Sequence, residues 1–383
     1  MKIGIPKERR AGEKRVAASP ETVKKFAGLG CSVVVETGAG LAADIPDDQY
    51  TAMGATIAPD ASATLRDADL VLKVQRPMTA AEGNDELALL KKGAVLVAAL
   101  QPLQQREQVK AYAAAGVTAF AMELMPRITR AQSMDILSSQ SNLAGYKSVL
   151  DAAQHFGRAF PMMMTSAGTI APARVFIMGV GVAGLQAIAT AKRLGAVVSA
   201  TDVRPATKEQ VESLGGKFVW VDDEEARASQ TAGGYAKEMS AEYKAKQAAL
   251  IAETVKKQDI VITTALIPGR PAPVLVTEEM VKSMRPGSVI VDLAVEAGGN
   301  CPLSKVDQVV EVNGVKIVGY SNYPSRVPVD ASNLYAKNLW NFLSPHWDKD
   351  SKTFKFNFED ETVTGTCLTR DGAVIHPQLK ERA

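Results

Sequence analysis

Short apolar runs alternate with longer amphipathic stretches along most of this 383-residue chain. A strand buried on both faces is a continuous apolar run, whereas a covering helix places apolar residues every three or four positions. This alternation predicts an α/β protein with parallel sheets. The expected strands are residues 2–5, 32–36, 70–74, 94–98 and 118–121 in the first half, and 175–178, 197–201, 217–221, 259–264, 288–293 and 316–319 in the second.

A polar run at residues 126–141 interrupts the pattern directly after an expected strand. Loops at strand ends commonly carry binding residues, so this run is a candidate site. A helix is expected from Asn142 to about Phe156. Residues 161–172, which include three consecutive methionines, are expected to form a connector packed on the second half.

The C-terminal region predicts a return to the first domain through a helix over residues 331–343. Asp371-Gly372 is a strong turn signal and predicts a hairpin formed by residues 353–368 and 372–376. We therefore expect two Rossmann-like, doubly wound parallel-sheet domains separated by a cleft. The first comprises residues 1–141, completed by the C-terminal segment 326–383, and the second comprises residues 142–325.

The second domain begins with a strand, a glycine-rich turn and a helix. Gly179 permits a sharp turn, Gly181 lets the backbone approach a pyrophosphate, and Gly184 lets helix and strand pack closely. Asp202 ends the next strand, where an acid accepts hydrogen bonds from an adenosine ribose. This combination favours NAD(H), although the nearby Arg204 is also what a 2′-phosphate would require. The first domain contains no such glycine motif.

Residues 222–239 form too long an interval for a tight connection, and paired glycines there precede Tyr235. The composition fits a mobile flap that closes over a ligand, and it fits a disordered surface insertion equally well.

Composition narrows the possible partners. A net charge of +2 and the lack of a basic tract favour neither nucleic acid nor anionic lipid. Three widely spaced cysteines and no signal-peptide pattern indicate a reducing, cytoplasmic setting. Three scattered histidines make a zinc site unlikely, so no metal is expected. Apolar residues 175–191 are too short, and too rich in glycine, to span a membrane.

With these motifs in hand, the chain resembles the NAD(H)-binding component, domain I or the α1 subunit, of proton-translocating nicotinamide nucleotide transhydrogenase. The resemblance covers essentially the whole length. The segments that carry it are residues 4–8, 73–77, 122–127, 130–135, 231–239 and 292–300.

The resemblance implies two groups of site residues. On the nicotinamide side it places Arg127, Ile128, Thr129, Gln132, Asp135 and Ser138, of which Gln132 can bond the carboxamide or ribose. The second domain would supply Gly179, Gly181, Val182, Gly184, Asp202, Val203, Arg204, Gln247 and Leu266, and Gly234 and Tyr235 from the flap. Arg127, Gln132, Asp135, Ser138 and Tyr235 would serve the transfer step.

The resemblance also implies an activity and an assembly. The chain would present NADH for direct hydride transfer to NADP⁺ held by a separate subunit, a Re/Si-specific reaction that needs orientation and exclusion of water rather than acid–base catalysis. A further, transmembrane subunit would couple the transfer to proton movement. The chain is then expected to be a homodimer without direct membrane insertion, peripheral on the cytoplasmic face of the inner membrane and active only within the complex.

Two alternatives remain open. Alanine dehydrogenase resembles this chain too, including at Arg15, but it needs a lysine and a histidine where Gln75 and Gln101 stand here. A glutamine is neither a general acid nor a general base near neutral pH, so this alternative ranks lower. The other alternative is a non-catalytic NAD(H)-binding module.

Overall fold

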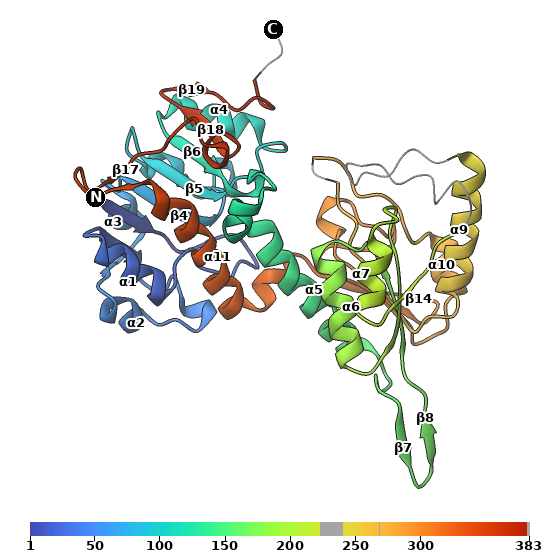
Figure 1. Ribbon diagram of the computed structural model, residues 1–383. Coiled ribbons are helices and arrows are strands. Elements are labelled where there is room, and N and C mark those ends of the chain that lie inside the picture. Colours follow the sequence, from blue (N-terminus) through green and yellow to red (C-terminus); the bar gives the residue numbers. More distant parts are fainter. Residues whose placement is uncertain (223–239, 268, 381–383) are drawn as a thin grey trace. The chain divides into compact units, whose positions relative to one another are not determined.

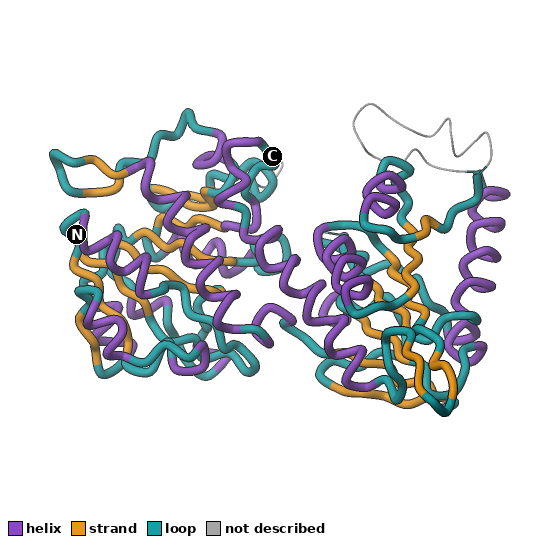
Figure 2. Tube along the Cα trace, turned by 60° about the horizontal axis from the view of Figure 1, so that its bottom comes forward, coloured by secondary structure: helices purple, strands orange, loops and turns teal. Residues whose placement is uncertain are grey.

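The computed structural model describes residues 1–222, 240–267 and 269–380. The chain divides into two compact units. Unit 1 comprises residues 1–140 and 324–383, and unit 2 comprises residues 141–323. In each unit the strands run side by side with helices on both sides (Figure 2).

Unit 1 is organised on an eight-stranded sheet in the order β19-β18-β6-β5-β4-β1-β2-β3 (Figure 1). Its six strands from β6 to β3 are parallel, while β18 and β19 are added antiparallel at the β6 edge. The strands are β1 (Lys2–Ile5), β2 (Ser32–Glu36), β3 (Thr56–Ala58), β4 (Leu70–Gln75), β5 (Val95–Ala99), β6 (Thr118–Ala121), β18 (Cys367–Arg370) and β19 (Ala373–Val374).

Alternate residues of these strands feed two cores, one on each face of the sheet. Leu72 and Val97 pack on one face with Tyr335, and Val71 and Leu96 pack on the other. This two-sided burial explains the continuous apolar runs in the sequence. The helices of unit 1 are α1 (Pro20–Gly28), α2 (Asp47–Ala52), α3 (Ala61–Leu65), α4 (Arg106–Ala114), α11 (Pro328–Leu343) and α12 (Glu361–Thr364).

Unit 2 carries a seven-stranded sheet in the order β11-β10-β9-β12-β13-β15-β14, parallel except for β14. Its strands are β9 (Arg174–Met178), β10 (Val197–Thr201), β11 (Lys217–Phe218), β12 (Ile260–Thr263), β13 (Val289–Asp292), β14 (Gln308–Val312) and β15 (Val315–Gly319). Its helices are α6 (Val182–Arg193), α7 (Thr207–Ser213), α9 (Ala241–Val255) and α10 (Glu278–Ser283), together with most of α5 (Ile136–His155). The fold class is therefore Rossmann-like α/β, as predicted.

The methionine-rich segment differs from the prediction of a packed connector. It forms an antiparallel hairpin, β7 (Met163–Thr165) and β8 (Gly168–Ile170), that projects from the rest of unit 2 (Figure 1). All six strand residues are exposed, and Met164 has 78% of its surface accessible. The prediction was wrong because composition alone does not say whether methionines fill a core or line a surface.

Three other boundaries change. The helix expected from Asn142 begins at Ile136, because Asp135 caps it. Strands β3 and β14 were not predicted, since each has little buried apolar surface. The hairpin turn at Asp371-Gly372 is confirmed, with positive φ at both residues. Its first strand begins only at Cys367, and β17 (Thr353–Phe354) pairs separately with β16 (Trp347–Asp348). No helix within the described ranges has the length and apolar character needed to cross a bilayer.

Candidate functional site

The turn between β9 and α6 has the geometry that its three glycines predict. Gly179 has a φ of +101°, and a Cβ there would lie 2.6 Å from Thr264 Oγ1. A Cβ on Gly184 would lie 1.9 Å from the Gly179 carbonyl oxygen, whereas one on Gly181 would meet no described atom within 4 Å. Gly179 and Gly184 are thus fixed by close packing, and Gly181 borders open space.

Helix α6 begins at Val182, and within the described residues no side chain caps its N-terminal cap residue, Gly181. The first-turn amides and the positive end of the helix dipole therefore face the open space beside Gly181. Such a terminus accommodates a phosphate without a bulky group in the way. The turn therefore fits the pyrophosphate of a dinucleotide.

Asp202 lies at the carboxyl end of β10, beside this turn. Its Oδ2 accepts from the Val180 amide at 2.7 Å and from Arg204 Nη2 at 3.0 Å, and its Oδ1 accepts from the Arg204 amide at 2.9 Å and Nε at 2.8 Å. Burial alone would raise the pKa of Asp202, but these hydrogen bonds, led by those from the Arg204 side chain, hold it below its usual value. The carboxylate is therefore ionised at neutral pH.

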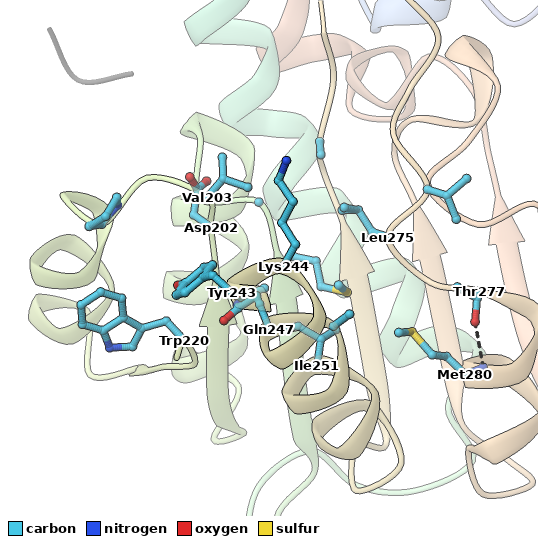
Figure 3. A pocket seen from close by; sticks show the side chains of 17 residues that line it. Asp202, Val203, Trp220, Tyr243, Lys244, Gln247, Ile251, Leu275, Thr277 and Met280 are labelled. Carbon is cyan, nitrogen blue, oxygen red and sulfur yellow. Dashed lines mark hydrogen bonds between the residues drawn. The ribbon is translucent and has the colours of Figure 1, made fainter. Parts of the chain in front are cut away.

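A cavity of about 550 Å³ opens next to Asp202. In the view of Figure 3, Asp202 and Val203 lie on one side, Leu275 and Met280 on the other, and residues of α9 lie between them. Its volume is within the usual range for a small-molecule site, and its lining is mostly apolar. The lining residues are Met178, Gly179, Thr201, Asp202, Val203, Pro205, Trp220, Tyr243, Lys244, Gln247, Ala248, Ile251, Ala265, Val274, Leu275, Thr277 and Met280.

Gln247, a predicted nucleotide contact, lines this cavity but is held by the protein itself. Its Oε1 accepts from the Val221 amide at 2.9 Å, and its Nε2 donates to Thr201 Oγ1 at 3.3 Å. Gln247 therefore braces α9 against the end of β10. Val182, Val203 and Leu266 are exposed around the turn, with 39%, 81% and 56% of their surfaces accessible.

The segment 292–300 shapes the other side of the turn, a role that the sequence motif did not reveal. Asn300 accepts from the Ala265 amide at 3.1 Å and donates to the carbonyls of Ala265 and Pro273. Asp292 is fully buried and accepts from the Asn300 amide at 3.1 Å. These bonds hold the chain after β12 against the glycine turn.

The predicted nicotinamide-side residues all lie in unit 1, on the 3-10 helix Thr129–Met134 and at the start of α5. Arg127, Thr129 and Gln132 are exposed, and Ile128 is partly buried. Asp135 accepts from the Ser138 hydroxyl at 2.5 Å and from its amide at 3.0 Å. Asp135 and Ser138 therefore fix the first turn of α5, as a positioning role requires.

Helix α11 holds this segment in place. Asn338 and Asn341 both donate to the Ser133 carbonyl, at 2.8 and 3.0 Å, and Ser139 donates to Asn338 Oδ1 at 2.7 Å. The exposed side chain of Gln132 thus sits on a backbone fixed beside it.

The structure therefore groups the predicted residues in two sets. Gly179, Gly181, Val182, Gly184, Asp202, Val203, Arg204, Gln247 and Leu266 surround the turn and cavity of unit 2, and the six residues from Arg127 to Ser138 form one segment of unit 1. Gly234 and Tyr235 lie outside the described residues. Trp220, Tyr243, Lys244, Leu275 and Met280 were missed, because only the packing of α9 and α10 brings them to the cavity.

The residues that bear on the amino-acid dehydrogenase alternative are tied to each other. Arg15 donates to Glu13 through Nε and Nη2, at 2.8 and 2.7 Å, and through Nη1 to Gln140 at 2.9 Å. Gln75 donates to the same Glu13 at 2.9 Å. Burial alone would raise the pKa of Glu13, but the bonds from Arg15 lower it to about 2. Gln101 is exposed at the end of β5.

Among the described residues, no group of three or more His, Cys, Asp and Glu side chains is arranged to hold a metal ion. Cys31, Cys301 and Cys367 are buried and unbridged.

Comparison with known proteins gives a consistent result over the whole chain. The family described as alanine dehydrogenase/PNT matches twice, with its N-terminal domain at residues 4–144 and its C-terminal domain at residues 148–377. An NAD(P) transhydrogenase subunit alpha protein of Rhodospirillum rubrum is 68% identical over 379 residues, covering 99% of both chains.

Two further relatives bracket the resemblance. The crystal structure of transhydrogenase from Sinorhizobium meliloti matches with a TM-score of 0.88 and 54% identity, over 98% of this chain and 100% of that one. Alanine dehydrogenase of Bacillus subtilis is 32% identical over 338 residues, covering 86% of this chain and 81% of that protein. The chain is thus much more similar to these transhydrogenases than to this dehydrogenase.

Proposed function

The chain belongs to the alanine dehydrogenase/PNT family, and from that premise we propose that it is the NAD(H)-binding subunit of a proton-translocating NAD(P) transhydrogenase. The observation that carries this proposal is the turn between β9 and α6. Its open Gly181, the uncapped start of α6 and the ionised Asp202 offer sites for the pyrophosphate and the adenosine ribose of NAD(H).

In this proposal the bound nicotinamide supplies the hydride, which passes directly to NADP⁺ on a partner subunit. The protein holds and orients the dinucleotide and keeps water away. Gln132 bonds the carboxamide or ribose, Asp135 and Ser138 hold the α5 start that positions it, and Arg127 supplies a fixed charge. Gly234 and Tyr235 are proposed to cover the nucleotide, and Val203 and Arg204 to line its adenosine side.

The proposed partners are an NADP(H)-binding subunit and a transmembrane subunit that couples hydride transfer to proton movement. The chain would be peripheral on the cytoplasmic face of the inner membrane through them. We also propose a homodimer. The exposed methionines of the β7–β8 hairpin support it, because a second copy would remove this apolar surface from water.

Alanine dehydrogenase is the weaker proposal on a specific observation. Three donor groups of Arg15 are bound to Glu13 and Gln140, and Gln75 is bound to Glu13. An amino-acid substrate would have to break these buried bonds and would meet glutamines that transfer no proton.

The decisive experiment mixes the purified chain with the NADP(H)-binding subunit of a transhydrogenase. Hydride exchange between NADH-type and NADP-type nucleotides should be rapid in the mixture and absent for either component alone. Nucleotide binding without exchange would instead favour a non-catalytic NAD(H)-binding module. Reduction of NAD⁺ by the chain with alanine would favour the dehydrogenase.

The variant Gln132→Asn tests the nicotinamide side. The shorter amide should slow exchange while leaving NADH affinity nearly unchanged, because the positioning contact matters most in the transition state. Gln104→Asn, in the loop before α4, is the matched control. Exchange at the wild-type rate in Gln132→Asn would contradict the assignment.

A further inference from the structure

The Asp202 carboxylate is saturated by donors from its own unit. A carboxylate has about four lone-pair positions. Two are used by the backbone amides of Val180 and Arg204, and two by Nε and Nη2 of the Arg204 guanidinium. An adenosine ribose, which approaches Asp202 with two hydroxyl donors, therefore requires lone pairs that are already in use.

The four donors are not equally replaceable. The two amides belong to the glycine turn and to the chain after β10, so they cannot move without disturbing the backbone. The Arg204 side chain is 40% exposed, whereas that of Asp202 is only 7% exposed. Besides Asp202, the guanidinium bonds the Val180 carbonyl at 3.1 Å. The guanidinium fork is thus the component that can leave toward solvent.

We propose that Arg204 competes with the adenosine ribose for Asp202, and thereby weakens NAD(H) binding and narrows the preference for NAD(H) over NADP(H). This inference rests on the proposed NAD(H) site. NAD(H) seats its ribose only in the fraction of molecules whose Arg204 fork has moved away, so the apparent affinity is reduced by that fraction.

The charges give the two nucleotides opposite responses. A 2′-phosphate is repelled by Asp202 and attracted by a displaced Arg204 guanidinium, which pairs well with phosphate. Without the guanidinium, the carboxylate has two free lone-pair positions and an uncompensated charge. NADH then gains an acceptor for its ribose, and NADPH loses the guanidinium that would offset the repulsion.

The test is the binding of NADH and NADPH to wild-type protein and to Arg204→Met, measured by calorimetry and by nucleotide fluorescence. We expect the NADH dissociation constant to fall roughly three- to tenfold and that of NADPH to rise, since a charge-assisted bond no longer has to be broken. The gain for NADH should appear in the association rate. Arg204→Lys, which offers one contact rather than a fork, should give intermediate values.

Two controls separate this competition from general effects. Lys208→Met removes the same charge from α7, where Lys208 lies over the Trp220 ring at 5.4 Å, and should change both affinities little. In an Asp202→Asn background, Arg204→Met should no longer improve NADH binding, because the contested carboxylate is gone.

The contrary outcomes are distinct. If NADH and NADPH both bind Arg204→Met more weakly, Arg204 contacts the nucleotide directly and the competition is refuted. Equal affinities in wild type and variant would refute it as well. Should Arg204→Met not fold, the same comparison with Arg204→Lys decides. Failure of the wild-type chain to bind NADH would overturn the proposed function itself.

Discussion

The two units share one strand order and use its central crevice in opposite ways. Unit 1 runs β3-β2-β1-β4-β5-β6 and unit 2 runs β11-β10-β9-β12-β13-β15, so each sheet reverses direction beside its first strand. Ligands of such sheets bind at that reversal, at the carboxyl ends of the strands. In unit 2 the position has an open glycine turn and a cavity. In unit 1 it is filled by the protein's own ion pairs.

The segment after the first strand produces this difference. In unit 2, α6 begins at Val182, soon after β9 ends at Met178, with no side-chain cap from the described residues. In unit 1 the chain runs from Pro6 to Ser19 without a helix, and α1 is closed by a capping box between Ser19 and Thr22. Its first-turn donors are used internally, so α1 offers no comparable anion site.

Charged side chains occupy the crevice of unit 1. Lys73 is 1% exposed and lies 3.3 Å from Glu8 and 3.2 Å from Glu86, both also buried. The same topology thus gives a binding site or a buried charge network, depending on whether the turn after the first strand is glycine or a charged residue. Four variants test this contrast.

The largest effect is expected from Lys73→Met in unit 1. It leaves Glu8 and Glu86 buried without their cation, which should lower the free energy of unfolding by about 3–5 kcal/mol. Chemical denaturation measures the loss, and Lys110→Met, at an exposed ion pair on α4, should change it by about 0–1 kcal/mol. Equal effects of the two variants would mean that the network does not stabilise unit 1.

Glu123→Gln should change how stability depends on pH. Glu123 Oε1 accepts the amides of Leu100 and Gln101, and Oε2 is buried with no partner among the described residues. Burial raises the pKa of Glu123 to about 7, against the hydrogen bonds that lower it, and Tyr112 and Tyr335 are the titratable groups that sense its charge.

Because the folded pKa lies above the unfolded one, this carboxyl stabilises the fold fully below about pH 4.5 and loses that contribution as pH rises through 7. The loss is roughly 3 kcal/mol, at about 1.4 kcal/mol per pKa unit. Glu123→Gln should remove it, which thermal unfolding between pH 5 and pH 8 would show. Glu107→Gln, 87% exposed, should unfold with the wild-type pH profile. A wild-type profile for Glu123→Gln instead would contradict the assignment.

Gly184→Ala should cost about 1–3 kcal/mol of stability, because its Cβ would overlap the Gly179 carbonyl and force the glycine turn open. NADH affinity should fall with it. Gly28→Ala, at the end of α1 in unit 1, meets no described atom within 4 Å and should be neutral or slightly stabilising. A stable Gly184→Ala protein with normal affinity would show that helix and strand need not pack so closely.

The smallest change is expected from Gly181→Ala. No described atom obstructs its Cβ, so the melting temperature should stay the same or rise slightly. The added methyl group would occupy the side from which the pyrophosphate approaches, and NADH affinity should fall about tenfold, or 1.4 kcal/mol. Unchanged affinity would place the phosphates elsewhere.

Local sequence predicted the elements of this protein that depend on local chemistry. Strands β1, β2, β6 and β10 were predicted with the bounds that the structure shows, because strands buried on both faces are apolar along their length. The glycine turn was predicted for the same kind of reason, since backbone conformation is set within a few residues.

Contacts between distant residues were decided only by the tertiary structure. Nothing near Gln247 distinguishes a nucleotide contact from a brace on Val221 and Thr201, and nothing near Met164 distinguishes a buried methionine from the tip of an exposed hairpin. Arg204 follows Asp202 in the sequence, but the saturation of the carboxylate also needs the Val180 amide from the turn after another strand. Burial and hydrogen-bond partners are properties of the folded chain, because they depend on which elements pack together.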